Sequence, residues 1–330
     1  MAKKHIYLVD TKLLGYYLFQ RGSQVTGIFD KIAQLLFDKP KGDIYLGWDI
    51  GKSSYRLDVS PTYKGHRDVL KSKLQQSDLD ALAEFNKAYI NLSKFADKLP
   101  VYNLRVQGVE CDDMCSIIAK QFENHPDYKV WLVTADMDWI HSVVGTNNVC
   151  IIDVYNSGSI IDHDEVVKKY GLSTRREFTI LKSIMGDKSD NIKFCKNLGP
   201  IKARDLFDTI HSKYKNPSDS QIASVIEDYL HKKEQRRLQK GLLQSIEVHD
   251  DHKSCGRTTA TEAFLANLSI ADPFTDKSRL TPEQLEEFNK CLVRVLPDKY
   301  DYTSDLLNVL DELGSAIQFG FKAQKIFKVV

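Results

Sequence analysis

A set of short apolar runs, each leading to an acidic residue, constrains the fold of this chain more than any other feature. The first is HIYLVD, which is rich in branched and aromatic side chains and ends at Asp10. Runs of this length and composition are typical of buried β-strands. Three further runs share the pattern: DIYLGWD, which ends at Asp49, VYNLRVQGVE, which leads to Glu110, and KVWLVTAD, which ends at Asp136.

Segments with helical spacing separate these runs. Strands that alternate with helices predict an α/β fold, with a mostly parallel central sheet flanked by helices. In such sheets, binding and chemistry take place at the carboxyl ends of the strands, where the acidic residues lie in this sequence. VCIIDV, at 149–154, is a further strand that completes the sheet. The helical segments are 25–38, 68–97 and 112–123.

The pattern becomes helical after about residue 160. The segments 162–171 and 174–187 have the spacing of amphipathic helices, and NLGPIKARDLFDTI (197–210) indicates a turn followed by a helix. The sequence therefore predicts an α/β domain over 1–160 and a helical domain over 161–330, with a helix-turn-helix hairpin near 187–210. A basic stretch, HKKEQRRLQK, lies in this domain and is either a solvated helix or part of a surface that binds an anionic partner.

Composition excludes several classes of protein. Hydrophobic residues make up 42% and charged residues 28% of the 330 residues, as in soluble globular proteins. No apolar run is long enough to span a bilayer, and Asp10 interrupts the apolar start before a signal core forms. The six cysteines form no CxxC pair, which favours free thiols in a reducing compartment over disulfides or a zinc site. We expect a cytoplasmic protein.

Two more carboxylates lie in the stretch MGDKSDNI, where Asp187 and Asp190 follow a helical segment and Gly186 marks a turn. Asp and Asn are ordinary residues of turns and helix N-termini, so this stretch alone fits a structural role as well as a functional one. The acids of the other segments favour a functional role, because several strand ends bring them to one edge of the sheet. The full set is Asp10, Asp49, Glu110, Asp112, Asp113, Asp136, Asp138, Asp187 and Asp190.

So many carboxylates in one cleft repel one another and raise one another's pKa values. Apart from Lys188, which follows Asp187, the short motifs contain no Lys or Arg next to these acids, so divalent cations are the natural partners. Oxygen ligands suit Mg²⁺ or Mn²⁺, and two such ions about 4 Å apart activate water and stabilise the leaving oxygen in phosphodiester cleavage. Setting nine acids aside leaves 46 basic against 36 acidic residues, an excess that suits contact with a phosphate backbone.

The segment SSYRLDVSPTYKGHRD (53–68) interleaves aromatic and basic residues. Tyr55, Arg56 and Tyr63 fit a surface that contacts the backbone and stacks on bases, with a solvated basic turn as the alternative. Lys64 and Arg67 are three residues apart and share a face if the segment is helical, so both side chains can reach a scissile phosphate. Residues 63–100 then form either a helical arch over the site or a plain helical pair packed on the sheet.

Taken in order, these motifs resemble the flap endonuclease / 5′-3′ exonuclease family of PIN-like nucleases, and its bacteriophage members most of all. The resemblance covers residues 5–210 and implies that 1–160 is the PIN-like nuclease domain. GDKSDNI at 186–192 is the most specific of the motifs. The others are the strand-end acids Asp10 and Asp49, YKGHR at 63–67, ECDD at 110–113 and TADMD at 134–138.

The resemblance implies a Mg²⁺-dependent, structure-specific 5′ nuclease of DNA replication that cleaves phosphodiesters near 5′ ends, flaps, nicks, single-strand/duplex junctions or RNA primers, with an RNA/DNA hybrid as a further substrate. If a phage encodes the chain, the location is the host cytoplasm. It implies that Lys64 and Arg67 contact the scissile phosphate. Asp49, Glu110, Asp112 and Asp113 would hold the first metal with Asp10 beside them, and Asp136, Asp138, Asp187 and Asp190 the second.

The hairpin departs from the family pattern, because KFCKNLGPIKARDLF lacks most of the usual glycines. This leaves open whether glycine amides contact a duplex and whether hairpin carbonyls bind K⁺. Lys196, Lys202 and Arg204, beside Gly199, are expected to supply the contact to DNA. The tail at 316–330 either packs on the domain or docks a replication clamp or a single-strand-binding protein. Two other functions fit less well: a PIN-type ribonuclease of single-stranded RNA and a junction-binding protein that does not cleave.

Overall fold

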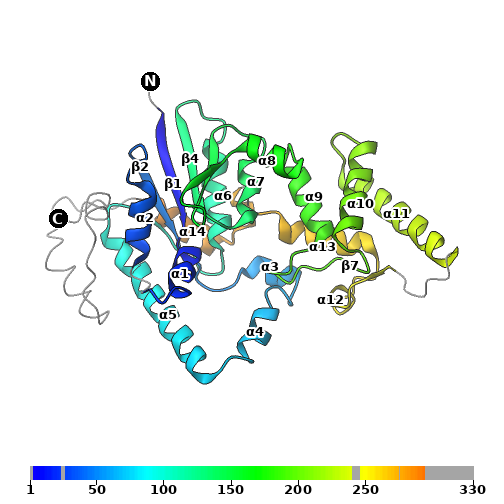
Figure 1. The fold of residues 1–330 in the computed structure, drawn as a ribbon, viewed down its shortest axis with the longest axis horizontal. Coiled ribbons are helices and arrows are strands. Elements are labelled where there is room, and N and C mark those ends of the chain that lie inside the picture. Colours follow the sequence, from blue (N-terminus) through cyan, green and yellow to red (C-terminus); the bar gives the residue numbers. More distant parts are fainter. Residues whose placement is uncertain (1–2, 24–26, 240–245, 275, 294–330) are drawn as a thin grey trace. The chain divides into compact units, whose positions relative to one another are not determined.

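The computed structural model describes residues 3–23, 27–239, 246–274 and 276–293 (Figure 1). The chain divides into two compact units, each described here by itself. The sheet unit comprises residues 1–53, 74–173 and 274–330, and the helical unit comprises 54–73 and 174–273. Within the described residues, no helix combines the length and the apolar character needed to cross a membrane. The tail at 316–330 lies outside the described residues.

The sheet unit contains six strands in the order β3-β2-β1-β4-β5-β6. The first five are parallel to their neighbours, and β6 pairs antiparallel with β5. The mostly parallel sheet predicted from the sequence is therefore confirmed. The strands are β1 Lys4–Asp10, β2 Gly42–Gly47, β3 Tyr102–Leu104, β4 Tyr128–Thr134, β5 Val149–Asp153 and β6 Ser159–Ile161.

Helices cover the sheet because its strands are apolar on both faces. Tyr7 and Val9 of β1 belong to a core cluster with α2 and α5, whereas Ile6 and Leu8, which point the other way, are equally buried. Helix α6 packs against β1, β2 and β4. The helices of this unit are α1 Thr11–Phe19, α2 Ile28–Leu36, α5 Gln76–Phe95, η2 Ala96–Lys98, α6 Cys111–Phe122, η3 Met137–Trp139, α7 Ile140–Val143, α8 His163–Tyr170, η4 Lys277–Arg279 and α14 Pro282–Cys291.

Two predicted elements differ from the structure. The strand expected over 101–110 is limited to β3, because residues 105–110 lead into the first turn of α6. The helical segment expected over 68–97 is two helices, α4 (His66–Lys71) and α5, since Gln75 has extended backbone angles and begins α5 as its N-cap. In both cases the prediction assigned the right type of element but the wrong boundary, because the periodicity of apolar residues does not define where an element ends.

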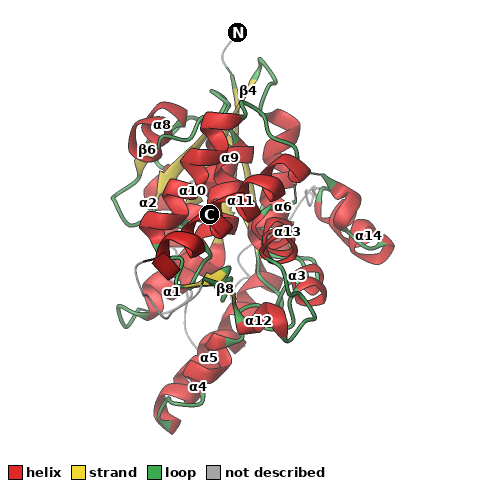
Figure 2. Cartoon of the chain, turned by 90° about the vertical axis from the view of Figure 1, so that its right-hand side faces the viewer, coloured by secondary structure: helices red, strands yellow, loops and turns green. Residues whose placement is uncertain are grey.

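The helical unit is organised by helices with complete capping boxes, in which N-cap and N3 residues bond each other's backbone N–H groups. Thr174 and Glu177 cap α9 in this way, and Thr259 and Glu262 cap α13, which packs against α9. Helices are the main regular structure of this unit, and Figure 2 shows them in red beside the short strand β8 in yellow. Its elements are α3 Ser54–Val59, α4, α9 Arg175–Met185, β7 Cys195–Lys196, α10 Pro200–Lys213, α11 Asp219–Gln239, β8 Glu247–Val248, α12 Asp250–Lys253 and α13 Ala260–Ala271.

Candidate active site

Asp10 ends β1 and serves as the N-cap of α1, so the strand and the helix together fix its carboxylate. Its Oδ1 accepts a hydrogen bond from the Leu13 N–H at 2.9 Å, and its Oδ2 accepts one from the Thr134 hydroxyl at 3.1 Å. Burial raises the pKa of Asp10 to about 7, and the nearby charges of Asp49 and Asp136 contribute to the rise. A buried carboxylate in this setting is a strong attractant for a cation.

Asp49 lies just after β2, at the N-terminus of α6. Its Oδ1 accepts the backbone N–H of Cys111 at 2.6 Å, and its own N–H donates to the Tyr89 hydroxyl at 3.2 Å. The positive end of a helix stabilises a carboxylate in this position. Gly47 makes the close approach feasible, since a Cβ on that residue would overlap with the Cys111 sulfur.

The first turn of α6 carries three more carboxylates, from Glu110, Asp112 and Asp113. Each offers an oxygen atom, and these three atoms lie within 4.8 Å of one another. Glu110 is 5% exposed and Asp113 is fully buried, with its Oδ1 accepting the Phe274 N–H at 3.1 Å. Oxygen donors so close together, with part of the group out of water, fit a hard divalent cation such as Mg²⁺ or Mn²⁺.

Asp136 and Asp138 follow β4 in a short 3₁₀ turn. Asp136 caps this turn, with its Oδ1 accepting the Asp138 N–H at 2.9 Å. The Thr134 hydroxyl donates to Asp10 and accepts the Asp136 N–H at 3.0 Å, so one side chain links the ends of β1 and β4. The sheet unit thus brings the acids of its strand ends to one edge.

The helical unit holds Asp187 and Asp190 in the loop after α9. Gly186 has a φ of 71°, and Asp187 and Ile192 exchange backbone hydrogen bonds of 2.8 Å, which closes the loop into a tight turn. Burial disfavours the charged form of Asp187, but Lys182, 3.4 Å away, and two hydrogen bonds from Ser189 outweigh it and lower its pKa.

Asp190 is 8% exposed and is surrounded by the segment YKGHR. Its Oδ1 lies 3.3 Å from Arg67 Nη2 and 3.7 Å from Lys64 Nζ, and its Oδ2 accepts the Tyr63 hydroxyl at 3.3 Å. The expectation that these two acids have no adjacent Lys or Arg was therefore wrong. The cations come from residues 64, 67 and 182, which the local motif does not contain.

The residues predicted to contact nucleic acid have two different environments. Arg56 is 3% exposed and donates through Nε to the Ile270 carbonyl at 3.0 Å, while Tyr63 is 2% exposed and packs with Ile192 and Ile270. Both side chains fix the 54–73 segment against α13. Tyr55 is half-buried.

The hairpin residues lie nearer the surface. Gly199 is exposed and is the N-cap of α10. Lys196 pairs with Asp250 at 2.7 Å, Lys202 donates to the Asn197 carbonyl at 2.8 Å, and Arg204 pairs with Asp208 at 2.9 Å. Surface pairs of this kind contribute little stability.

Sequence reasoning missed a group of polar residues that hold the Asp190 loop from the side of α12 and α13. They are Asp251, His252 and Asn267, which contact Asn191 or the Lys193 carbonyl. No motif marks them, and only buried polar residues in an apolar helix, such as Asn267 within ATEAFLANLSIA, are a signal.

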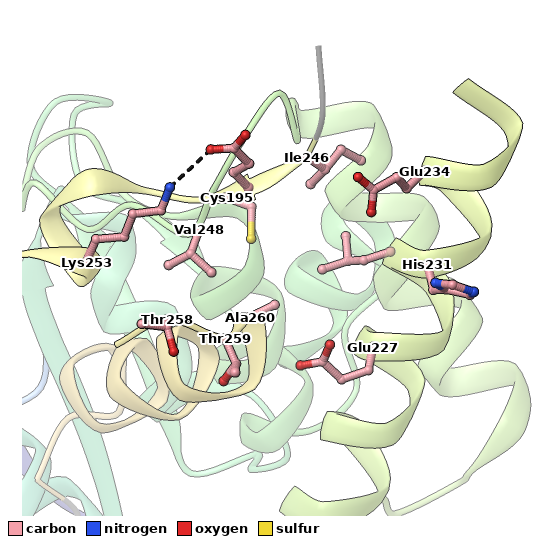
Figure 3. Close-up of a pocket in the computed structure, with 12 residues that line it drawn as sticks. Cys195, Glu227, His231, Glu234, Ile246, Val248, Lys253, Thr258, Thr259 and Ala260 are labelled. Atoms are coloured by element: carbon pink, nitrogen blue, oxygen red, sulfur yellow. Dashed lines mark hydrogen bonds and ion pairs between the residues drawn. The ribbon is translucent and has the colours of Figure 1, made fainter. Parts of the chain in front are cut away.

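A cavity of about 410 Å³ lies elsewhere in the helical unit, between α11, β8 and the start of α13 (Figure 3). Cys195, Glu227, His231 and Thr259 are among its lining residues, and the Lys253–Glu247 ion pair lies at its rim. None of the predicted site residues lines it. We therefore place the candidate active site at the carboxylates, not at this cavity.

A mostly parallel sheet whose carboxyl edge gathers buried carboxylates defines a class of α/β enzymes with divalent-metal sites, for which phosphodiester hydrolysis is a characteristic reaction. The model of the 5′-3′ exonuclease N-terminal resolvase-like domain matches residues 6–171. The chain belongs to the 5′-3′ exonuclease family. This confirms the family to which the motifs pointed, and with it the prediction of a nuclease that hydrolyses phosphodiester bonds.

Individual relatives agree with this assignment. The flap endonuclease of Escherichia phage T5 is 32% identical over 208 residues, which span 60% of this chain and 67% of that protein. The 5′-3′ exonuclease of Buchnera aphidicola is 26% identical over 214 residues, with the same coverage of 60% and 67%. A crystal structure of the phage T5 flap endonuclease in a pseudo-enzyme-product complex with DNA and metal ions shares the fold, with a TM-score of 0.62 at 18% identity over 93% of this chain and 100% of that one.

Proposed function

We propose that this nuclease is structure-specific and cleaves near 5′ ends, flaps, nicks or RNA primers during DNA replication, with two Mg²⁺ or Mn²⁺ ions. The group of Glu110, Asp112 and Asp113, with oxygen atoms within 4.8 Å of one another, carries the proposal. Relatives named as a flap endonuclease and a 5′-3′ exonuclease, one of them crystallised with DNA and metal ions, support the substrate class.

In this proposal the first ion is held by Asp49, Glu110, Asp112 and Asp113, with Asp10 beside them. The second is held by Asp136, Asp138, Asp187 and Asp190. The ions would supply an activated water and stabilise charge on the leaving oxygen. Hydrogen bonds from the Leu13 N–H and the Thr134 hydroxyl would hold the Asp10 carboxylate in place, and the backbone N–H of Cys111 would orient the Asp49 carboxylate.

Lys64 and Arg67 would stabilise the charge that develops on the scissile phosphate. Both side chains converge on Asp190 Oδ1, and the Arg67 side chain is 50% exposed, so its guanidinium is accessible to a phosphate. Lys196, Lys202 and Arg204 would contact the duplex backbone. A cytoplasmic location, which the six free thiols favour, completes the proposal.

The test is cleavage of a labelled 5′-flap substrate with Mg²⁺. We expect Asp113→Asn to lower kcat at least about 100-fold, because loss of an outer-shell partner alone costs about 10- to 100-fold at a metal site. Asp127→Asn, at the opposite end of β4, is the matched control and should cleave like the wild type.

The same substrates separate the alternatives. Tight binding to the flap without cleavage in Mg²⁺ or Mn²⁺ would indicate the junction-binding protein. Faster cleavage of single-stranded RNA than of any flap would indicate the ribonuclease. Either result would overturn the proposal.

A further inference from the structure

The loop that carries Asp190 is tied to the segment carrying Lys64 at two points. The Lys64 N–H donates to the Asp190 carbonyl at 2.9 Å, and Asn191 Nδ2 donates to the Thr62 carbonyl at 2.9 Å. Lys64 has a φ of 54°, a left-handed conformation that is unfavourable for a residue with a Cβ. A conformation of this kind persists only where neighbouring contacts impose it, so the two hydrogen bonds help to hold the backbone from which the Lys64 side chain extends.

The side chain of Asn191 is itself oriented by a residue from a distant part of the sequence. Its Nδ2 reaches Asp251 Oδ2, in the first turn of α12, at 3.4 Å. The same carboxylate oxygen lies 3.1 Å from Lys193 Nζ. Because an amide nitrogen has two hydrogen atoms, Asn191 uses one for Thr62 and one for Asp251.

Backbone contacts fix the loop next to Asn191. The Lys193 carbonyl accepts from His252 Nε2 at 2.6 Å and from Asn267 Nδ2 at 2.9 Å, and Asn267 also donates to the Ser183 carbonyl at 3.0 Å. Burial lowers the pKa of His252, which keeps the ring neutral, and Asn267 is 1% exposed. Since α12 and α13 hold this backbone, Asp251 has a rigid base from which to orient Asn191.

We propose that Asp251 is a positioning residue for cleavage, which acts through Asn191 to set the place of Lys64 and Arg67. The inference rests on the proposed function, in which that basic pair contacts the scissile phosphate. Asp251 touches neither the phosphate nor a proposed metal ligand in this role. Without the Asp251 carboxylate, the Asn191 amide is no longer held in the orientation that donates to the Thr62 carbonyl. The segment that carries Lys64 and Arg67 can then shift. A displacement of about 1 Å in a contact to the transition state costs about 100-fold in rate.

The experiment measures kcat, KM and the Mg²⁺ concentration for half-maximal rate on a 5′-flap substrate. We expect Asp251→Ala to lower kcat about 10- to 50-fold while KM and the Mg²⁺ dependence change less than about 2-fold, because only a transition-state contact is disturbed. Asp251→Asn keeps an oxygen acceptor and should recover kcat to within about 3-fold of the wild type.

The matched control is Glu247→Ala. Glu247 pairs with Lys253 at 3.1 Å, the same distance as the Asp251–Lys193 pair, on the same β8–α12 turn. The Glu247→Ala variant should have the kcat of the wild type. Asn191→Gly provides the second arm, since glycine adopts the φ of 57° found at Asn191 and loses only the side chain. Adding Asp251→Ala to Asn191→Gly should cause no further loss.

Wild-type kcat in Asp251→Ala, or losses that multiply in the double variant, would overturn the inference. So would an Asp251→Asn enzyme as slow as Asp251→Ala. If Asp251→Ala does not fold, wild-type kcat in Asn191→Gly overturns it instead. The two proposals fail in different ways. If the wild-type protein cleaves no flap, the proposed function is refuted. If the wild type cleaves and Asp251→Ala cleaves equally well, only the role of Asp251 is refuted.

Discussion

Asp10→Asn should make the metal-free protein more stable at neutral and higher pH, although it removes a proposed metal-site residue. Burial and the charges of Asp49 and Asp136 raise the pKa of Asp10 from 3.8 to about 7. A tenfold change in proton affinity corresponds to about 1.4 kcal/mol, so the penalty for ionising Asp10 in the fold is at most about 4 kcal/mol. Relaxation around the charge reduces it, and we expect about 2 to 4 kcal/mol.

The direction follows from proton binding. Between pH 3.8 and about 7 the folded state binds more protons at Asp10 than the unfolded state does, so the free energy of unfolding falls as pH rises through this range. Asparagine is neutral at every pH and avoids the penalty, while its amide keeps an oxygen that accepts the Leu13 N–H. The advantage of the variant is therefore small near the acid end of this range and complete above about pH 7.

Urea unfolding in EDTA checks this expectation at about pH 4.5 and about pH 8. The variant should gain about 2 to 4 kcal/mol over the wild type at the higher pH and about 1 kcal/mol or less at the lower. Saturating Mg²⁺ at the higher pH should abolish or reverse the gain, because the ion stabilises the wild-type fold more. A difference that does not depend on pH, or a variant less stable in EDTA at the higher pH, would refute the electrostatic argument.

Two further substitutions test the local geometry. Gly47→Ala should weaken Mg²⁺ binding about 10-fold or more, because the added methyl group displaces the Cys111 N–H that orients Asp49. Titration calorimetry measures this affinity, and the second substitution Cys111→Ala should restore it by removing the sulfur that the methyl group meets. A double variant that binds Mg²⁺ as weakly as Gly47→Ala would contradict this explanation. Tyr63→Phe should lower the free energy of unfolding by about 1 kcal/mol and kcat a few-fold, since Asp190 loses a buried hydrogen bond; a variant as stable and as fast as the wild type would show that this bond contributes nothing.

The sheet and the acids at its edge were predictable because parallel strands end on the same side. Once Asp10, Asp49 and Asp136 were placed at strand ends, their common edge followed from topology alone. The hydrogen bonds that set their geometry were not predictable. The Thr134 hydroxyl between Asp10 and Asp136 depends on side-chain orientation, which a sequence pattern does not contain.

The partners of Asp190 were missed for another reason. Arg67 and Lys64 are more than 120 residues away in the sequence, and no periodicity links YKGHR to GDKSDNI. The burial of Arg56 and Tyr63 was missed because their segment alternates polar and aromatic residues, a pattern typical of an exposed surface. Asp251 was out of reach, since it lies beyond the residues covered by the motifs.

The interleaving of the two units along the chain restricts how such a protein can be divided or recombined. Residues 54–73 interrupt the sheet unit in sequence but pack with residues from 174–273. A fragment that stops at residue 173, close to where the family match ends, lacks Ile192 and Ile270. Tyr63 would lose its packing partners and Arg56 its carbonyl acceptor, and both side chains would be exposed to water. To transfer the helical unit to another protein, residues 54–73 must therefore be moved together with residues 174–273. Substitutions in either segment are constrained by the packing of the other.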